Sequence, residues 1–236
     1  MRKLLLTVLL LATTLNAQEV YATFSVQALK SANLAFSAGG IVDEVLVDVS
    51  SEVKKDQELV RLQSADLKAM IEISKTALYY AKREYDRQLK IKNMIDQSKL
   101  DSYAFKYENA KNQLAYQEEL LAKTILKAPF DGVIFEKMVE VGDVVSGAML
   151  RTILKIQSSK AQKLVMSVDQ KYWKSLKIGQ LFTYTVDGDN QKYEGKITNI
   201  YPYADSNNRK IIAEVAVSGF VVGLYGEGYI TIPEQK

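Results

Sequence analysis

Two stretches of the chain repeat each other at a constant offset of 92 positions, and this repeat restricts the possible folds more than any other feature. The run GIV at 40–42 corresponds to GVI at 132–134, and VDVSSEV at 47–53 corresponds to VEVGDVV at 139–145. Each copy has short β-branched runs, a turn, another short strand and a closing apolar stretch, at 59–62 and at 150–156. Neither copy can bury its apolar face alone, so the repeat predicts a small flattened barrel of two equivalent half-sheets.

The segment between the two copies has helical periodicity. No proline or glycine occurs from Gln63 to Ala128, as expected for long uninterrupted helices. Apolar and small residues recur every three or four positions in two arms, which predicts a coiled-coil hairpin with a turn near Met94 to Lys99. Each arm would reach on the order of 45 Å. The inward face is predicted to comprise Leu67, Ile71, Ser74, Leu78, Ala81 and Tyr85 in the first arm and Leu100, Tyr103, Tyr107, Ala110, Leu114, Gln117, Leu121 and Thr124 in the second.

At the level of individual residues, the two copies resemble the two halves of a biotinyl/lipoyl-type domain. The first copy carries V-x-V-x-x-x-V-K-K-x-Q-x-L from Val47 to Leu59, and the second carries APFDGVI at 128–134 followed by VGDVV at 141–145. The second pattern is similar to the corresponding half in the HlyD-like membrane fusion proteins, the periplasmic adaptors of tripartite efflux pumps. Ser50 and Asp56 stand where that family usually has glycine at turns, and both residue types are turn formers.

From Lys160 onward the pattern changes to short strands, expected at 163–168, 180–186, 193–200, 210–217 and 228–232. Asp169 is expected to cap a short helix that ends at Gly179, with Tyr172, Trp173 and Leu176 facing inward. Asp187 to Asn190 reads as a hairpin turn. This segment resembles the family's β-barrel domain, which the strand from Val20 to Leu29 is expected to join.

The expected fold class is therefore mixed, mainly β with a long α-helical coiled-coil hairpin: a split lipoyl-like (barrel-sandwich hybrid) domain plus a β-barrel domain. The expected divisions are a signal peptide at 1–17, an N-terminal barrel strand at 18–30, the first lipoyl-like half at 31–63, the hairpin at 64–127, the second half at 128–158 and the barrel at 159–236.

The first residues have the form of an export signal. Arg2 and Lys3 precede an apolar run from Leu4 to Leu15, and cleavage is expected after Ala17. The alternative is an uncleaved anchor, although twelve apolar residues fall short of the roughly 20 that span a bilayer. Either way, the working part of the protein is expected in the periplasm, associated with the inner membrane through a partner.

The chain contains no histidine and no cysteine, which removes several classes of chemistry. A Ser-His-Asp or Cys-His pair cannot be assembled, and zinc sites built on these residues are excluded. The net charge is only +3. Binding of nucleic acid needs a concentrated basic stripe, which so small a charge does not indicate. We therefore expect no catalytic residue, cofactor or resident metal.

Near the expected tip of the hairpin, Arg87 is followed by Ile91 four residues on and by Ser98 seven residues after that. This spacing is similar to the signature by which the family meets a TolC-like outer-membrane channel, with Ile91 in place of leucine. The resemblance implies that these three residues bind the channel. The alternative is that Arg87 and Ser98 are ordinary solvated helix residues, with Ser98 as the N-cap of the second helix.

The resemblance implies a non-enzymatic coupler that self-associates into a ring and links an inner-membrane transporter to the outer-membrane channel. The resistance-nodulation-division (RND) type is the favoured transporter, from the family's commonest pairing, and an ATP-driven transporter is the alternative. One rival is a lipoyl- or biotinyl-type carrier, which needs a modifiable lysine in a tight turn between the halves. A second rival is a coiled-coil scaffold that simply dimerises. A third alternative is a metal-binding adaptor, but the chain lacks histidine, cysteine and any methionine cluster.

Overall fold

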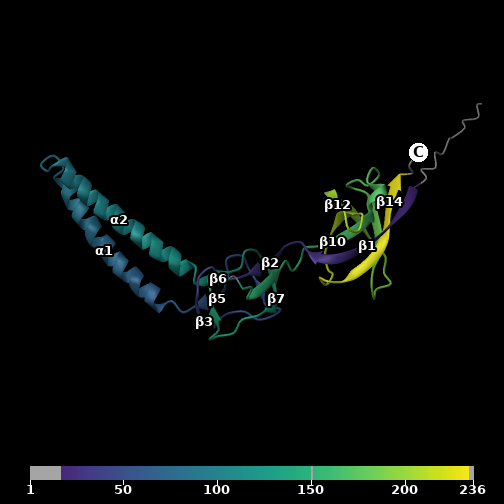
Figure 1. Cartoon of the computed structure of the whole chain (residues 1–236), viewed down its shortest axis with the longest axis horizontal. Helices are drawn as coiled ribbons and strands as arrows, with labels where there is room; N and C mark the ends of the chain where they lie inside the picture. The colour runs from purple at the N-terminus through teal and green to yellow at the C-terminus, as the bar shows by residue number, and fades with distance from the viewer. Residues whose placement is uncertain (1–16, 150, 234–236) are drawn as a thin grey trace, which may run out of the picture. The chain divides into compact units, whose positions relative to one another are not determined.

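The sequence repeat folds into two four-stranded sheets, in a computed structural model that describes residues 17–149 and 151–233 (Figure 1). One sheet has the order β2-β9-β7-β4 and the other β6-β5-β3-β8. The predicted signal peptide lies outside the described residues, apart from its last residue. The strands are β2 (Ser31–Leu34), β3 (Gly40–Val45), β4 (Glu52–Val53), β5 (Glu58–Leu62), β6 (Ile125–Lys127), β7 (Gly132–Lys137), β8 (Val144–Val145) and β9 (Leu154–Gln157).

The pairings of β3 with β8 and of β7 with β4 repeat at the offset of 92. Gly40 pairs with Val145, and the equivalent pair, shifted by 92 positions, is Gly132 with Val53. In the next ladder Val42 pairs with Leu62 and the equivalent Ile134 pairs with Ile156, so β9 is offset from β5 by 94 positions. The β3·β5 and β7·β9 ladders are each interrupted by a register shift at the same place, after Val42 and after Ile134. Fourteen buried apolar residues from both copies fill the space between the sheets. The prediction of two equivalent half-sheets around one core is confirmed.

The segment between β5 and β6 forms two helices that pack side by side, α1 (Ala65–Lys90) and α2 (Gln97–Ala122) (Figure 1). Each of the fourteen residues predicted for the inward face is buried or partly buried. Tyr85 and Tyr107 stack across the pair with ring centroids 5.7 Å apart. The helical hairpin is therefore present, whereas coiled-coil packing of its side chains stays a prediction.

A closed barrel of the order β1-β10-β13-β12-β11-β14 forms the other compact unit, which among the described residues comprises 17–29 and 160–233. Its core contains seventeen buried residues, which alternate along the strands. The β-barrel prediction is confirmed. Its elements are β1 (Ala17–Ala28), β10 (Gln162–Asp169), the short 3-10 helix η1 (Gln170–Tyr172), β11 (Leu181–Val186), β12 (Tyr193–Asp205), β13 (Lys210–Val217) and β14 (Tyr225–Pro233).

The short helix after β10 forms as predicted in one respect and differs in another. The carboxylate of Asp169 caps it by accepting the Lys171 N–H at 2.9 Å. Leu176 is buried and Tyr172 packs against the core, but Trp173 is 64% exposed. The prediction that Trp173 faces inward is wrong, because the 3-10 helix ends at Tyr172 and the chain then turns, so helical spacing no longer sets the direction of the side chain.

Candidate functional site

The turn of the hairpin spans residues 91–96, slightly earlier than the predicted 94–99. Helix α1 ends at Lys90, and Ile91 caps it by donating its N–H to the Gln88 carbonyl at 3.1 Å. Helix α2 begins after Asp96, whose carboxylate accepts the Ser98 N–H at 2.8 Å. Asp96, not Ser98, is therefore the N-cap, so the prediction that Ser98 caps the second helix is wrong, whereas Ser98 is an exposed residue in the first turn of that helix. Aspartate is at least as good a cap as serine, which explains the choice.

Arg87 lies in the last turn of α1 and its side chain is 62% exposed. It forms an ion pair with Glu84, three residues before it, and the other oxygen of Glu84 accepts a hydrogen bond from Gln88 Nε2 at 3.0 Å. An exposed pair of this kind contributes little to stability. The guanidinium is thus held on the helix surface but remains accessible to a partner.

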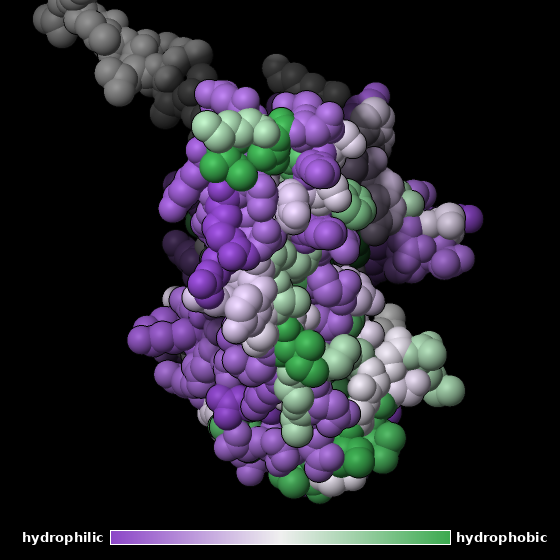
Figure 2. Space-filling view, turned by 90° about the vertical axis from the view of Figure 1, so that its left-hand side faces the viewer, coloured by the Kyte–Doolittle hydropathy of each residue, from purple (hydrophilic) through white to green (hydrophobic). Residues whose placement is uncertain are grey.

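Exposed apolar side chains gather at the turn. Ile91 is 44% exposed and Met94 is 87% exposed. Figure 2 looks toward the hairpin end of the molecule, where the surface is mostly hydrophilic with small hydrophobic patches. The sequence analysis missed Met94, and the signal that could have identified it is an apolar residue inside a predicted turn, where burial is not expected.

The structure places the three predicted residues around one turn without joining them. Arg87 and Ile91 lie one helical turn apart at the end of α1, and exposed Ser98 lies in the first turn of α2. Within the described part of the chain, no hydrogen bond or ion pair connects them. The tip therefore offers a cation, an aliphatic group and a hydroxyl as separate contacts.

A shallow groove runs along α1 from Tyr79 to Lys90, and it is mainly basic. Lys82, Arg83, Arg87 and Lys90 line it together with Tyr79 and the carboxylate of Asp86. Lys82 Nζ donates a hydrogen bond of 2.7 Å to Asp86, which raises the pKa of this lysine. The groove is suited to carbonyl or carboxylate groups of a partner.

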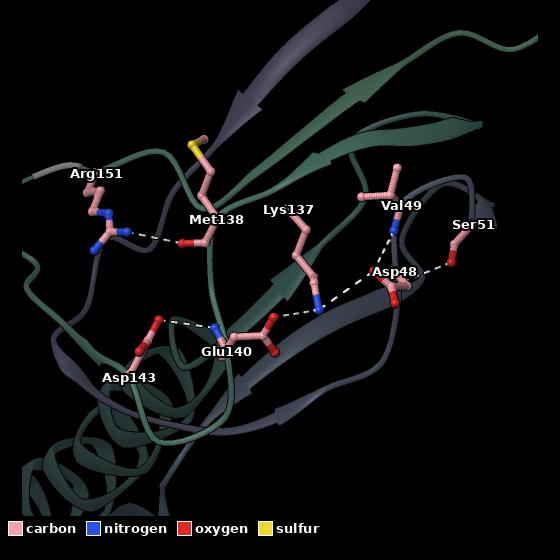
Figure 3. A network of polar contacts seen from close by, with 8 residues as sticks. All are labelled: Asp48, Val49, Ser51, Lys137, Met138, Glu140, Asp143 and Arg151. Carbon is pink, nitrogen blue, oxygen red and sulfur yellow. Dashed lines mark hydrogen bonds and ion pairs between the residues drawn. The ribbon is translucent and has the colours of Figure 1, made fainter.

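A second cluster of polar groups connects the two copies of the repeat (Figure 3). Lys137 Nζ lies 2.9 Å from Glu140 Oε1 and 3.6 Å from Asp48 Oδ1. Asp48 and Glu140 are equivalent positions of the repeat. The hydrogen bond to Glu140 raises the pKa of Lys137, and the charge of Asp48 acts in the same direction. One lysine therefore links the same position in both halves.

Each of these carboxylate positions begins a tight turn of the same design. The Asp48 N–H donates to Ser51 Oγ at 2.9 Å, and the Glu140 N–H donates to Asp143 Oδ2 at 3.0 Å. The third residue of each turn has positive φ, 71° at Ser50 and 91° at Gly142. Asp56 also has positive φ, at 65°. The turn assignments made for Ser50 and Asp56 from the sequence are confirmed.

Two kinds of feature are absent from the described residues, 17–149 and 151–233. These residues contain no group of three acidic side chains arranged to hold a metal ion. Neither do they contain a helix long and apolar enough to cross a membrane.

Comparison with known proteins identifies one matching family model and several similar proteins. The family described as "CzcB-like, barrel-sandwich hybrid domain" matches residues 30–155. An uncharacterised protein of Haemophilus influenzae is 24% identical over 181 residues, 75% of this chain and 47% of that protein. The cobalt-zinc-cadmium resistance protein CzcB of Cupriavidus metallidurans is 24% identical over 207 residues, 80% of this chain and 39% of that protein. The chain thus spans less than half the length of either relative.

Among solved structures, a MacA-MexA chimeric protein containing the Pseudomonas aeruginosa MexA α-hairpin domain superposes with a TM-score of 0.85 at 21% identity. The alignment covers 92% of this chain and 81% of the chimera. This similarity concerns the fold alone, and it includes both the split lipoyl-like body and the barrel.

Proposed function

Because the chain belongs to the CzcB-like barrel-sandwich hybrid family of membrane fusion proteins, the periplasmic adaptors of efflux pumps, we propose that it links an inner-membrane transporter to a TolC-like outer-membrane channel. The transporter is proposed to be of the RND type. The role is structural coupling, and the substrate of the pump is left to the transporter. The protein is proposed to reach the periplasm through the signal peptide at 1–17.

The observation that carries this proposal is the connection between β5 and β6. In a lipoyl or biotinyl carrier these strands would be joined by a tight turn that presents the modified lysine. Here the connection is a pair of 26-residue helices, which span about 39 Å at 1.5 Å per residue. A projection of this length is suited to reaching a distant partner and leaves no carrier turn.

The tip supplies chemistry that fits a channel built from helices. The Arg87 guanidinium can donate several hydrogen bonds to carbonyl groups at a helix end. Ile91 and Met94 offer apolar surface to an adjacent groove, and the Ser98 hydroxyl can bond to exposed backbone. We propose these residues as the channel-binding tip.

Self-association into a ring is part of the proposal. Neighbouring copies would stand side by side, with the hairpins forming a tube. Lateral contacts between such narrow elements are individually small, so the isolated protein is expected to be a monomer or a weak oligomer. Light scattering that shows a tight dimer at micromolar concentration would instead support a simple coiled-coil scaffold, and an intact mass that includes lipoate or biotin would support a carrier.

The decisive test is Arg87→Asp in a strain that lacks the native gene. Growth is measured against a panel of dyes, detergents and cobalt, zinc and cadmium salts, and channel binding is measured by cross-linking from the tip. We expect loss of both resistance and cross-linking with unchanged helix content, because a solvated helix surface tolerates the charge.

The matched control is Lys75→Asp. Lys75 lies on the same helix, is exposed, and pairs with Glu72 three residues before it, as Arg87 does with Glu84. It lies three turns farther from the tip, so resistance and cross-linking should be retained. Full activity of the Arg87 variant, or equal loss in both variants, would contradict the tip assignment.

A further inference from the structure

The chain's single tryptophan lies on the surface of the barrel, beside a groove to which the proposed function assigns no role. The groove has a volume of about 650 Å³. Trp173 and Leu176 line it from the segment after η1, and Ile200, Tyr203 and Ile211 line it from β12 and β13. We call this region, residues 170–178 with 200–211, the Trp173 edge.

Two local features keep aromatic rings out of the core here. The 3-10 helix ends before Trp173, which is 64% exposed. On β12 the ladder to β13 is interrupted between Ile200 and Ala204, so the stretch around Pro202 is unpaired and Tyr203 is 60% exposed. A bulge of this kind redirects side chains away from the regular alternation. Ile178, in the next turn, is 65% exposed as well.

The charged residues around the edge are mostly cationic. They comprise Lys171, Lys174, Lys177, Arg209 and Lys210 against the two carboxylates Asp169 and Asp205. Both carboxylates accept backbone N–H groups, from Lys171 at 2.9 Å and from Asn207 at 2.8 Å. Among the described residues, none of the five cations forms an ion pair. Two of the lysines instead lie over aromatic rings, Lys171 over Tyr172 at 4.9 Å and Lys174 over Trp173 at 5.4 Å.

We propose that the Trp173 edge binds the surface of a membrane that contains anionic lipids. Tryptophan and tyrosine rings favour the boundary between headgroups and acyl chains, where one end of the ring is apolar and the other is wet. Lysines beside them reach the phosphates of the headgroups, since their flexible stems extend along apolar surface.

The choice of lipid over protein follows from the kind of cation. Lysine is depleted at protein–protein interfaces, where arginine is enriched, and four of the five cations here are lysines. The exposed apolar groups are single rings and one isoleucine rather than a continuous flat patch. This inference does not depend on the channel-binding tip, and the two can fail separately.

Trp173 itself provides the measurement, because no other tryptophan contributes to the emission. The purified full chain is titrated with vesicles of equal parts phosphatidylcholine and phosphatidylglycerol. The emission should shift to shorter wavelength, and quenching by iodide should decrease. Vesicles of phosphatidylcholine alone should cause neither change. No shift with the anionic vesicles, or the same shift with both, would overturn the proposal.

The charge requirement is tested with the triple variant K171Q/K174Q/K177Q. Each lysine near an anionic surface strengthens binding by about tenfold or less, so the variant should need roughly 100-fold more lipid for the same shift. The matched control K92Q/K99Q/K106Q removes the same charge from the hairpin and should titrate like the wild type. Equal titration of the two variants contradicts the electrostatic part of the proposal and therefore the proposal.

Depth and direction are tested by moving the tryptophan. In a W173F background, I178W should report the same shift, whereas V221W should not. Val221 follows Val217, which pairs with Gln162 at the opposite end of β10 from Asp169 and η1. If Trp173 responds to a detergent-solubilised transporter but not to anionic vesicles, the edge is a protein-docking surface and the lipid proposal is wrong.

Discussion

The two halves of the lipoyl-like body have the same architecture but different sequences. The ion pair between Arg61 and Glu44 in the first half, 2.7 Å long, recurs in the second half between Lys155 and Glu136 at 2.7 Å. The register shifts and the positive-φ turns recur as well. Most of the residues at these positions differ, so the repeat is preserved as a set of backbone conformations and contacts.

The halves differ where the chain leaves them. In the second half β9 stays in the sheet through Gln157, which pairs with Ser31 of β2. In the first half β5 ends one position earlier in the equivalent ladder, at Leu62, and the chain departs into α1. The Gln63 N–H still donates to the Ile41 carbonyl at 2.9 Å before the chain enters α1. The surroundings of the two equivalent glycines nevertheless differ, with looser packing over Gly40 than over Gly132.

The largest expected effect tests this difference directly. A Cβ at Gly132 would lie 2.3 Å from the Gln157 carbonyl oxygen, which is backbone and cannot move aside. At the equivalent Gly40 it would lie 3.3 Å from Leu62 Cδ1, the end of a flexible side chain. We expect Gly132→Ala to lower the free energy of unfolding by about 3 kcal/mol, and Gly40→Ala by about 1 kcal/mol or less.

Urea unfolding followed by circular dichroism measures both variants. If Gly132→Ala does not accumulate in folded form while Gly40→Ala does, the asymmetry holds in its strongest form. Equal stability of the two variants would show that the packing over the two glycines does not differ.

A smaller effect is expected at the equivalent turns, and with opposite signs. Ser50 has φ of 71° and Gly142 has φ of 91°. A side chain in this region costs about 1 kcal/mol or somewhat more. Ser50→Gly should therefore stabilise the protein and Gly142→Ser should destabilise it, each by about 1 kcal/mol. Shifts of the urea midpoint in the same direction for both would show that the two turns are not equivalent.

The smallest effect is expected for the link between the halves. Lys137→Gln removes the contacts to Asp48 and Glu140, which are both on the surface, so the melting temperature should fall by less than in Gly142→Ser. Because the folded-state pKa of Lys137 is raised above its ordinary value of 10.5, its contribution is present at neutral pH and is lost as the pH rises through the folded-state value. Wild type and variant should therefore converge at strongly alkaline pH, and a difference that persists there would contradict the ionic origin.

Much of the fold was predictable because it follows from the local periodicity of apolar residues. The 3-4 spacing of both arms identified the inward faces of α1 and α2, since helical geometry alone determines which residues share a face. The resemblance to a family that has turn glycines at these positions identified the turns at Ser50 and Asp56, and capping chemistry identified the cap at Asp169. The tip residues could be placed near a turn, but their roles stay predictions, because binding depends on a partner.

The split repeat with a helical segment between its copies was thus determined by the sequence, because apolar periodicity and a constant offset are properties of the chain itself. Only the tertiary structure determined which residues are exposed and which distant residues come into contact. Trp173 has the spacing of a buried residue and is exposed because the 3-10 helix ends before it. Lys137 links Asp48 to Glu140 because the paired sheets bring two turns together that lie about ninety residues apart in the chain. Contacts of this kind depend on how strands and turns meet in space, and they cannot be inferred from the spacing of residues along the chain.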